Sequence, residues 1–325
     1  MFLDFQIQAV LFDIEKIYYP ILAAVGIPVN LLTIVILSRG NCGLSKCVTR
    51  YLVAMAAADL LVIILDLILR HIPIVHHLKN VRLLFVCNIH AVLLHAATDC
   101  SVWFTVSFTC DRFIAICCQK LKIKYCTEKS TAVVLATVTV LSCSKDIFWY
   151  FMYVQQYRLS NTPWFCYVNV RVKVSNFWTI IESLHYIFTP FLPFVLILLL
   201  NALTVKHILV NSRGRRRIRG HSSREGSKDP EMKSRRKSII LMFVISFNFI
   251  FLWSVFLVYS VWNRIQYLRI SVFPPLFLQE IGFMLQQLSC CTNTGIYVVT
   301  QTKFREQLKN VLKYPFTLIV KFIKS

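Results

Sequence analysis

Glycine is scarce in this chain, at 8 of 325 residues, where average usage near 7% would give about 23. Secondary transporters often contain internal repeats and helices broken by glycine or proline near the bilayer midplane, and no repeat relates the two halves of this sequence. Charged residues are also few, at 16%, against about 25% in soluble domains. These shortages disfavour a soluble enzyme and, less strongly, a transporter, which stays open as the competing class.

Several motifs are missing as well. The first 16 residues carry three acids and lack a basic start and a small-residue cleavage site, so no cleaved signal peptide is expected. No Cys–His spacing suggests zinc, so no metal is expected, and no nucleophile–base arrangement suggests an enzyme. The amino terminus has no N-x-Ser/Thr sequon, and no cysteine follows Cys291 to offer a palmitoylation site in the tail.

What the chain has instead is apolar length. Hydrophobic residues make up 57%, against about 45–50% in a soluble domain. Seven runs reach the roughly 20 residues that a helix needs to cross a bilayer. They lie at about 17–37, 48–69, 83–117, 131–154, 178–210, 238–261 and 273–300. The fourth run is the weakest, because Lys145 and Asp146 lie in its second half, and we expect that pair near the headgroups.

Basic residues predict the orientation. Lys and Arg number 36 against 15 Asp and Glu, and residues 206–237 alone hold twelve Lys/Arg and three acids. The other basic groups fall between runs one and two, between three and four, and after seven, so all share one face, which the positive-inside rule makes cytoplasmic. A basic run could also bind nucleic acid. Between two membrane helices it more often contacts anionic lipid or a partner protein.

An ion pair ends the third run. Arg112 lies about 29 residues from the outer end of that run, or roughly 43 Å along a helix, so Asp111-Arg112 is predicted at the cytoplasmic mouth rather than mid-membrane. Such a pair could act as a switch that opens with the bundle. A juxtamembrane pair without a role is the alternative.

With these features in order, the chain resembles a rhodopsin-like G-protein-coupled receptor. The shared landmarks, in chain order, are Asn30 in "GIPVN", Asp59, Cys87, "DRF" at Asp111-Arg112, Cys166, Pro193, Trp253, and Asn293 and Tyr297 in "NTGIY". The chain is most similar to a small subgroup of brain-expressed orphan receptors, some of which respond to aromatic amino acids.

The resemblance implies an all-α membrane protein, a seven-transmembrane helix bundle with a short amphipathic eighth helix. Residues 1–16 would be extracellular, residues 17–300 would form the receptor domain, and residues 301–325 would be a cytoplasmic amphipathic helix and tail. It implies a plasma-membrane receptor that transmits an extracellular small-molecule or peptide signal to heterotrimeric G proteins. A scavenger or a copy that no longer couples is the alternative within the family.

The resemblance also assigns residues. A disulfide would join Cys87 and Cys166. The switch for G-protein coupling would use Asp111, Arg112, Asn293, Tyr297 and Arg235. A water cluster, or Na⁺ as an allosteric ion, would lie among Asp59, Ser101, Ser289 and Asn293; no other cofactor is expected. The ligand pocket would hold Leu94, His185, Trp253 and Phe256, and a layer that repacks between two states would hold Val102, Pro193, Phe249 and Trp253. Ordinary helix packing is the alternative for that layer, and Trp103 would face lipid.

The chain also departs from the family pattern. Val255 and Thr294 replace prolines of spans six and seven, and Gln119 replaces the proline that usually follows the third-span motif. Arg235 stands where many relatives carry an acid, so we expect Arg112 to pair with Asp111 alone. The orphan subgroup has Glu and Arg where this chain has Leu94 and Phe256, which predicts a more apolar pocket.

Overall fold

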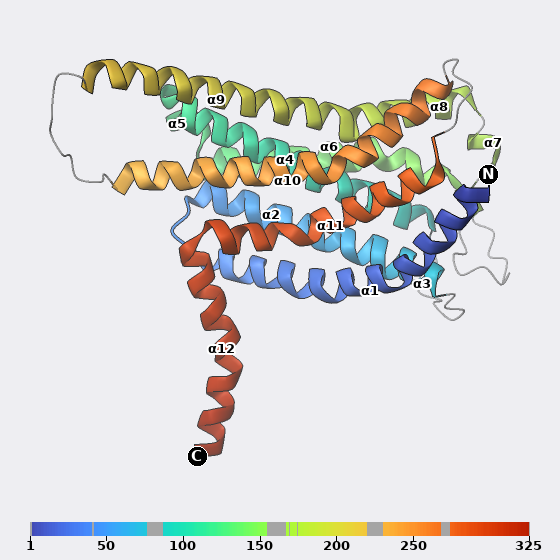
Figure 1. Cartoon of the computed structure of the whole chain (residues 1–325), viewed down its shortest axis with the longest axis horizontal. Coiled ribbons are helices and arrows are strands. Elements are labelled where there is room, and N and C mark those ends of the chain that lie inside the picture. The colour runs from blue at the N-terminus through green and yellow to red at the C-terminus, as the bar shows by residue number, and fades with distance from the viewer. Residues whose placement is uncertain are drawn as a thin grey trace.

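The structure is a computed structural model that describes residues 2–40, 42–76, 87–154, 167–168, 170–173, 175–219, 230–267 and 274–324. Seven helical rods run side by side and alternate in direction (Figure 1). They are α1 (Phe2–Ser38), α2–η1–α3 (Lys46–Val62, Ile63–His71, Ile72–Val75), α4 (Cys87–Cys117), α6–η2 (Glu128–Asp146, Ile147–Phe151), α8–η3–α9 (Asn176–Tyr186, Ile187–Phe191, Leu192–Arg219), α10 (Pro230–Tyr267) and α11 (Leu276–Thr300). Within the described residues, each of the seven predicted spans overlaps one of these rods; residues 83–86 and 273 lie outside the described part, and the fourth span ends in β1 (Tyr153–Val154).

Short elements connect the rods. α5 (Gln119–Tyr125) joins α4 to α6, while β1 (Tyr153–Val154), β2 (Tyr167–Val168) and α7 (Val170–Lys173) lie between η2 and α8. The two strands pair antiparallel, with Tyr153 opposite Val168. α12 (Thr302–Lys324) leaves the bundle and runs across its axis (Figure 1). That direction is the one a helix on a membrane surface takes, although α12 is longer than the short helix expected there.

Local chemistry sets several helix boundaries. The side chains of Ser45, Thr127 and Ser175 accept hydrogen bonds from backbone N–H groups in the first turns of α2, α6 and α8, and such caps satisfy donors that a helix leaves free at its start. Gly40 has φ +74° just after α1, a left-handed conformation that costs glycine little. Gly40 therefore marks the end of α1, and Ser45 marks the start of α2.

Six of the described rods are long and apolar enough to cross a membrane by length and composition. The seventh, α11, has 25 residues but carries Gln279, Glu280, Gln286, Gln287 and Asn293, which lower its hydropathy. It nevertheless packs along α10, α1 and α2 within the bundle. Its polar side chains therefore face partners inside the protein, as expected of polar residues in membrane helices.

The centre of the bundle is α4, which contacts α2, α6, α9 and α10. One apolar cluster fills the end nearest α12 and includes Tyr51, Phe108, Tyr297 and Phe304. Others lie between α1, η1 and α11, between α4, α9 and α10, and around Trp149 and Trp178. Because α4 adjoins most of the other rods, polar groups on it can bond to several of them.

Candidate functional site

The acid–base pair at the end of α4 is buried and bridges to another helix. Arg112 Nε donates to Asp111 Oδ2 at 3.0 Å, and Arg112 Nη2 pairs with the same carboxylate. Arg112 Nη1 also donates to the Ser238 hydroxyl of α10 at 3.2 Å. The expectation that Arg112 pairs with Asp111 alone was therefore wrong, because the Ser238 hydroxyl of α10 is a second partner of the guanidinium.

The loop after α4 also touches this pair. Cys126 Sγ donates to the backbone carbonyl of Asp111 at 3.6 Å. Burial, followed by the negative charge of Asp111, raises the pKa of the Cys126 thiol to about 12. The thiol is therefore protonated at neutral pH and serves as a donor rather than as a reactive thiolate.

The other predicted switch residues lie elsewhere. Tyr297 is buried in the apolar cluster nearest α12, where its ring meets that of Phe304 edge-on at 5.9 Å. Its hydroxyl is buried and has no hydrogen-bond partner among the described residues. Asn293 lies with Asp59. Arg235 falls within α10, but its side chain lies outside the described part of the chain.

Two of the residues predicted around Asp59, Ser101 and Asn293, bond to it. Ser101 Oγ donates to Asp59 Oδ1 at 2.5 Å, and Asn293 Nδ2 donates to Asp59 Oδ2 at 2.7 Å. Asp59 is 1% exposed, and Ser289 is buried on α11 one turn before Asn293. Each carboxylate oxygen keeps lone pairs beyond its one bond, and hydroxyl, amide and carboxylate oxygens are ligands that hard cations prefer. The residues present fit an Na⁺ ion as well as a water cluster.

Thr294, which replaces the proline of the seventh span, has a structural role. Its hydroxyl lies 2.8 Å from the Thr33 hydroxyl and donates to the Val29 carbonyl at 3.1 Å. Asn30 Nδ2 donates to the Cys290 carbonyl at 2.9 Å. These three bonds join α1 to α11 in the region where relatives have a proline.

An aromatic layer is built from three side chains of α10. Phe249 stacks on Trp253 with ring centroids 5.3 Å apart, and Trp253 meets Phe256 edge-on at 6.0 Å. Val102 belongs to the same buried cluster. Pro193 is buried on α9, but the α9 residue at the centre of the cluster is Ile197, one turn further on.

The predicted pocket residues connect to that layer through one further ring. His185 contacts Tyr186 at 5.7 Å, and Tyr186 contacts Phe256 at 6.4 Å. His95 stacks on Trp149 at 3.8 Å and meets His185 at 5.1 Å. Leu94, the neighbour of His95, is buried. The rings form a continuous path from His185 to Trp253.

Charged residues lie beside His185, so the surroundings of this predicted pocket residue are not purely apolar. Lys145 pairs with Asp99, and its Nζ lies 3.4 Å from Asp146 Oδ1 and 3.1 Å from His185 Nδ1. Thr189 Oγ1 donates to Asp99 Oδ1 at 2.5 Å. Asp99 and Asp146 are fully buried, so the charged groups of Asp99, Lys145 and Asp146 meet inside the bundle; the expected depth of Lys145 and Asp146 near the headgroups stays a prediction.

This group of charges was missed from the sequence. Asp99, Asp146 and His185 each present a ligand atom within 4.8 Å of the others. The Lys145 ammonium already pairs with both carboxylates, so an internal cation offsets part of their negative charge. The available signal was Asp99 in the middle of the third run together with a Lys-Asp pair in the fourth, because buried charges need partners.

A second pair lies one turn from His185. Arg264 of α10 pairs with Glu182 of α8 at 2.8 Å, and its guanidinium lies 4.7 Å from the centre of the Tyr186 ring. Both side chains are largely shielded. An acid and a base therefore stand near the predicted pocket, supplied by other positions than those of the orphan subgroup.

Only one cysteine of the expected external disulfide, Cys87, lies among the described residues. Cys87 is disulfide-bonded, while the ten other cysteines among the described residues are free. Cys166 lies outside the described residues, and its pairing with Cys87 stays a prediction.

The arrangement suits transmission rather than chemistry on a bound substrate. A path of aromatic contacts starts beside buried charges and reaches Trp253 and Phe249, while the opposite end of the bundle has an arginine that bridges α4 and α10. Residues 29–297, which are most of the chain, match the family described as 7 transmembrane receptor (rhodopsin family), and the protein therefore belongs to this family of signalling receptors.

Proposed function

We propose that this receptor transmits the binding of an extracellular small molecule or peptide to heterotrimeric G proteins. In this proposal the end of the bundle that carries α5 and α12 is cytoplasmic, and the amino terminus is extracellular. The excess of Lys and Arg at the α12 end supports that orientation. The similarity to brain-expressed orphan receptors extends the proposal to that subgroup.

The ligand would bind beside His185, Trp253 and Phe256, with Leu94 on the neighbouring helix. The ring contacts from His185 through Tyr186 to Phe256 support this, since a ligand that moves one ring moves the next in a packed interior. The Glu182–Arg264 pair gives a polar ligand two charged groups near the same rings.

One observation carries the coupling proposal: Arg112 binds Asp111 and Ser238 at the α12 end. Moving α10 away from α4 breaks the bond to Ser238 and frees a guanidinium at the mouth where a G protein would enter. A ligand shifts that equilibrium only as far as it binds the two states differently.

The same proposal includes Na⁺ at Asp59, Ser101, Ser289 and Asn293. A cation bound there would supply positive charge to a buried carboxylate and so favour the packing in which these residues are together. The two hydrogen bonds to Asp59 support the required proximity. A carboxylate satisfied by water alone is the other outcome.

The test is nucleotide exchange on a panel of purified G proteins, with the receptor reconstituted in lipid nanodiscs. Exchange above the rate of empty discs is expected for the wild type and is expected to vanish for Arg112→Ala. Arg50→Ala is the matched control, because Arg50 also lies at the α12 end but pairs with Glu128. If the receptor accelerates nucleotide exchange on none of the G proteins tested, the non-coupling alternative is favoured. If a solute accumulates in proteoliposomes that contain the protein, a transporter is favoured.

A further inference from the structure

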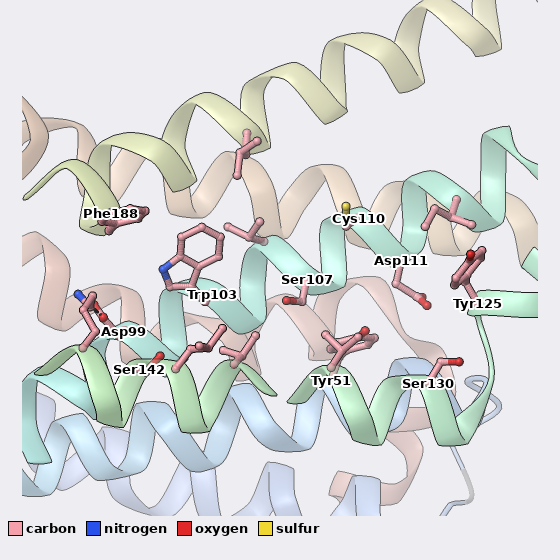
Figure 2. Close-up of a pocket in the computed structure, with 17 residues that line it drawn as sticks. Tyr51, Asp99, Trp103, Ser107, Cys110, Asp111, Tyr125, Ser130, Ser142 and Phe188 are labelled. Atoms are coloured by element: carbon pink, nitrogen blue, oxygen red, sulfur yellow. Dashed lines mark ion pairs between the residues drawn. The ribbon is translucent and has the colours of Figure 1, made fainter. Parts of the chain in front are cut away.

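A groove follows the outside of the bundle between α4, α6 and α9. It has a volume of about 760 Å³, within the roughly 300–1,000 Å³ of small-molecule sites. Asp99, Ser142 and Phe188 lie at one end, and Asp111, Tyr125 and Ser130 lie at the other, with Trp103 and Ser107 between them (Figure 2). The walls between the ends are mostly Val, Leu, Ile and aromatic side chains.

The groove faces the bilayer. Among its lining residues, Leu141 is 63% exposed, and Val134, Phe188 and Tyr125 are also exposed at the bundle surface. Leu141, Val134 and Phe188 lie on transmembrane rods, so in the membrane they contact lipid rather than water, while Tyr125 lies on α5 at the end of the groove. The occupant must therefore enter from the bilayer.

The length of the groove matches one leaflet. Asp99 and Asp111 are twelve residues apart on α4, which corresponds to about 18 Å. Half of the hydrocarbon core is roughly 15 Å thick. The groove is therefore long enough for an acyl chain that enters from the α12 end, and the Asp99–Lys145 ion pair lies at its far end.

The near end is strongly basic. Lys120, Lys122 and Lys124 are exposed on α5, and none of them pairs with an acid among the described residues. Lys124 Nζ lies 5.4 Å from the centre of the Tyr125 ring, which lines the groove. Leu121 and Ile123 are exposed on the same short helix, the latter at 83%. Basic and apolar side chains together are typical of a helix at an anionic membrane surface.

We propose that this groove binds the acyl chain of an anionic phospholipid, whose headgroup lies on the three α5 lysines. The apolar walls hold the chain, and the lysines select negative charge. A zwitterionic lipid would gain the first interaction but not the second, so the site should prefer phosphatidylserine over phosphatidylcholine.

Occupancy would also act on the switch. The groove ends at Asp111, the carboxylate that pairs with Arg112. A lipid held between α4, α5 and α6 would stabilise the present position of α5. This consequence rests on the proposed function, whereas the lipid site itself does not.

Quenching of Trp103 tests the site, because Trp103 lines the groove. The full-length receptor is placed in phosphatidylcholine discs that contain a minor fraction of phosphatidylserine, with bromine on the acyl chains of either lipid at equal mole fraction. The signal of Trp103 is the difference between wild type and Trp103→Phe. Brominated phosphatidylserine is expected to quench it more strongly than brominated phosphatidylcholine does.

Two triple variants distinguish a specific lipid site from a general attraction of anionic lipid to the basic face of the receptor. Lys120→Gln/Lys122→Gln/Lys124→Gln is expected to weaken the preference by up to about 100-fold. Lys303→Gln/Arg305→Gln/Lys309→Gln removes as much charge from exposed positions on α12 and is expected to leave the preference unchanged. Equal quenching by both lipids, or equal loss in both variants, would overturn the proposal.

A second measurement covers the case in which Trp103→Phe fails to fold. Native mass spectrometry of the receptor released from mixed discs counts the lipids that remain bound. Retained phosphatidylserine is expected for the wild type and the α12 variant, and its loss is expected for the α5 variant. Retention by all three would contradict the site. Neither measurement uses a ligand or a G protein, so a receptor that does not couple can still pass both.

Discussion

Arg112 of α4 donates a hydrogen bond to the hydroxyl of Ser238 of α10 across the α12 end of the bundle, at 3.2 Å. In a closed bundle this bond adds to the pair with Asp111, which lies on the same helix and cannot by itself join α4 to α10. In the proposed function, the closed state is therefore held through a neutral hydroxyl, which is a weaker partner for a guanidinium than a carboxylate.

Removing that hydroxyl should raise signalling without ligand. A hydrogen bond to a charged group contributes about 1.5–3 kcal/mol, so Ser238→Ala should raise basal G-protein activation at least several-fold at matched surface expression. Ser246→Ala is the control, since Ser246 lies on the same helix with a buried hydroxyl that lacks a partner among the residues the structure describes. Unchanged basal activity in Ser238→Ala would show that the bond does not hold the closed state.

Giving Arg112 a carboxylate partner should lower signalling without ligand. Arg235→Glu places a carboxylate where many relatives have one, on the helix that already contacts Arg112, and should reduce basal activation measured by nucleotide exchange. Arg235→Gln separates removal of the positive charge from addition of a partner. A rise in basal activity with Arg235→Glu would contradict this account of the pair.

The Asp59 cluster predicts a cation-specific stability. If Na⁺ binds with Ser101 and Asn293, NaCl should raise the melting temperature of the ligand-free receptor above its value in an equal concentration of a bulky-cation chloride, because a ligand of the folded state stabilises it by mass action. Asp59→Asn should remove the difference while keeping the volume of the side chain. The same difference in wild type and Asp59→Asn would place the effect elsewhere.

Sequence patterns predicted the rods better than the contacts between them. The seven apolar runs and the meeting of Asp59 with Ser101 and Asn293 followed from run length and from the resemblance. The bond from Arg112 to Ser238 did not, because a serine carries no sign that it faces an arginine 126 positions earlier. The pairing of Lys145 with Asp99 was not predicted for a similar reason: position along a helix is readable from sequence, but the direction of a side chain around the helix axis depends on packing.

The Lys145 ion pairs should be a weak point when one partner is lost. Lys145→Met leaves Asp99 and Asp146 buried without a cation, and breaking a buried pair typically costs about 3–5 kcal/mol. A marked fall in melting temperature and surface expression is expected. Lys46→Met is the control, because Lys46 pairs with Glu128 while itself 81% exposed, and such pairs contribute only about 0–1 kcal/mol.

Neutralising Asp99 should restore part of the stability that Lys145→Met loses. Asp99→Asn combined with Lys145→Met removes both members of the tightest pair, so the two changes should cost less together than the sum of their separate effects. The measurement is a double-mutant cycle of melting temperatures in one detergent. Strict additivity would mean that Lys145 and Asp99 do not depend on each other in the membrane.

The contact between α10 and α11 predicts a sharp difference between two glycines of one helix. A Cβ on Gly282 would lie 3.0 Å from the backbone Cα of Phe256, whereas one on Gly295 would meet nothing within 4 Å. Backbone cannot rotate away as a side chain can, so Gly282→Ala must move α11 off α10 and disturb the ring contact between Phe256 and Phe283. It should lower the melting temperature of the receptor and weaken the binding of any ligand beside Phe256.

Gly295→Ala should raise the free energy of unfolding by up to about 1 kcal/mol, because alanine favours a helix over glycine. Equal effects of the two substitutions on the melting temperature would show that the close approach at Gly282 does not set the spacing of these helices.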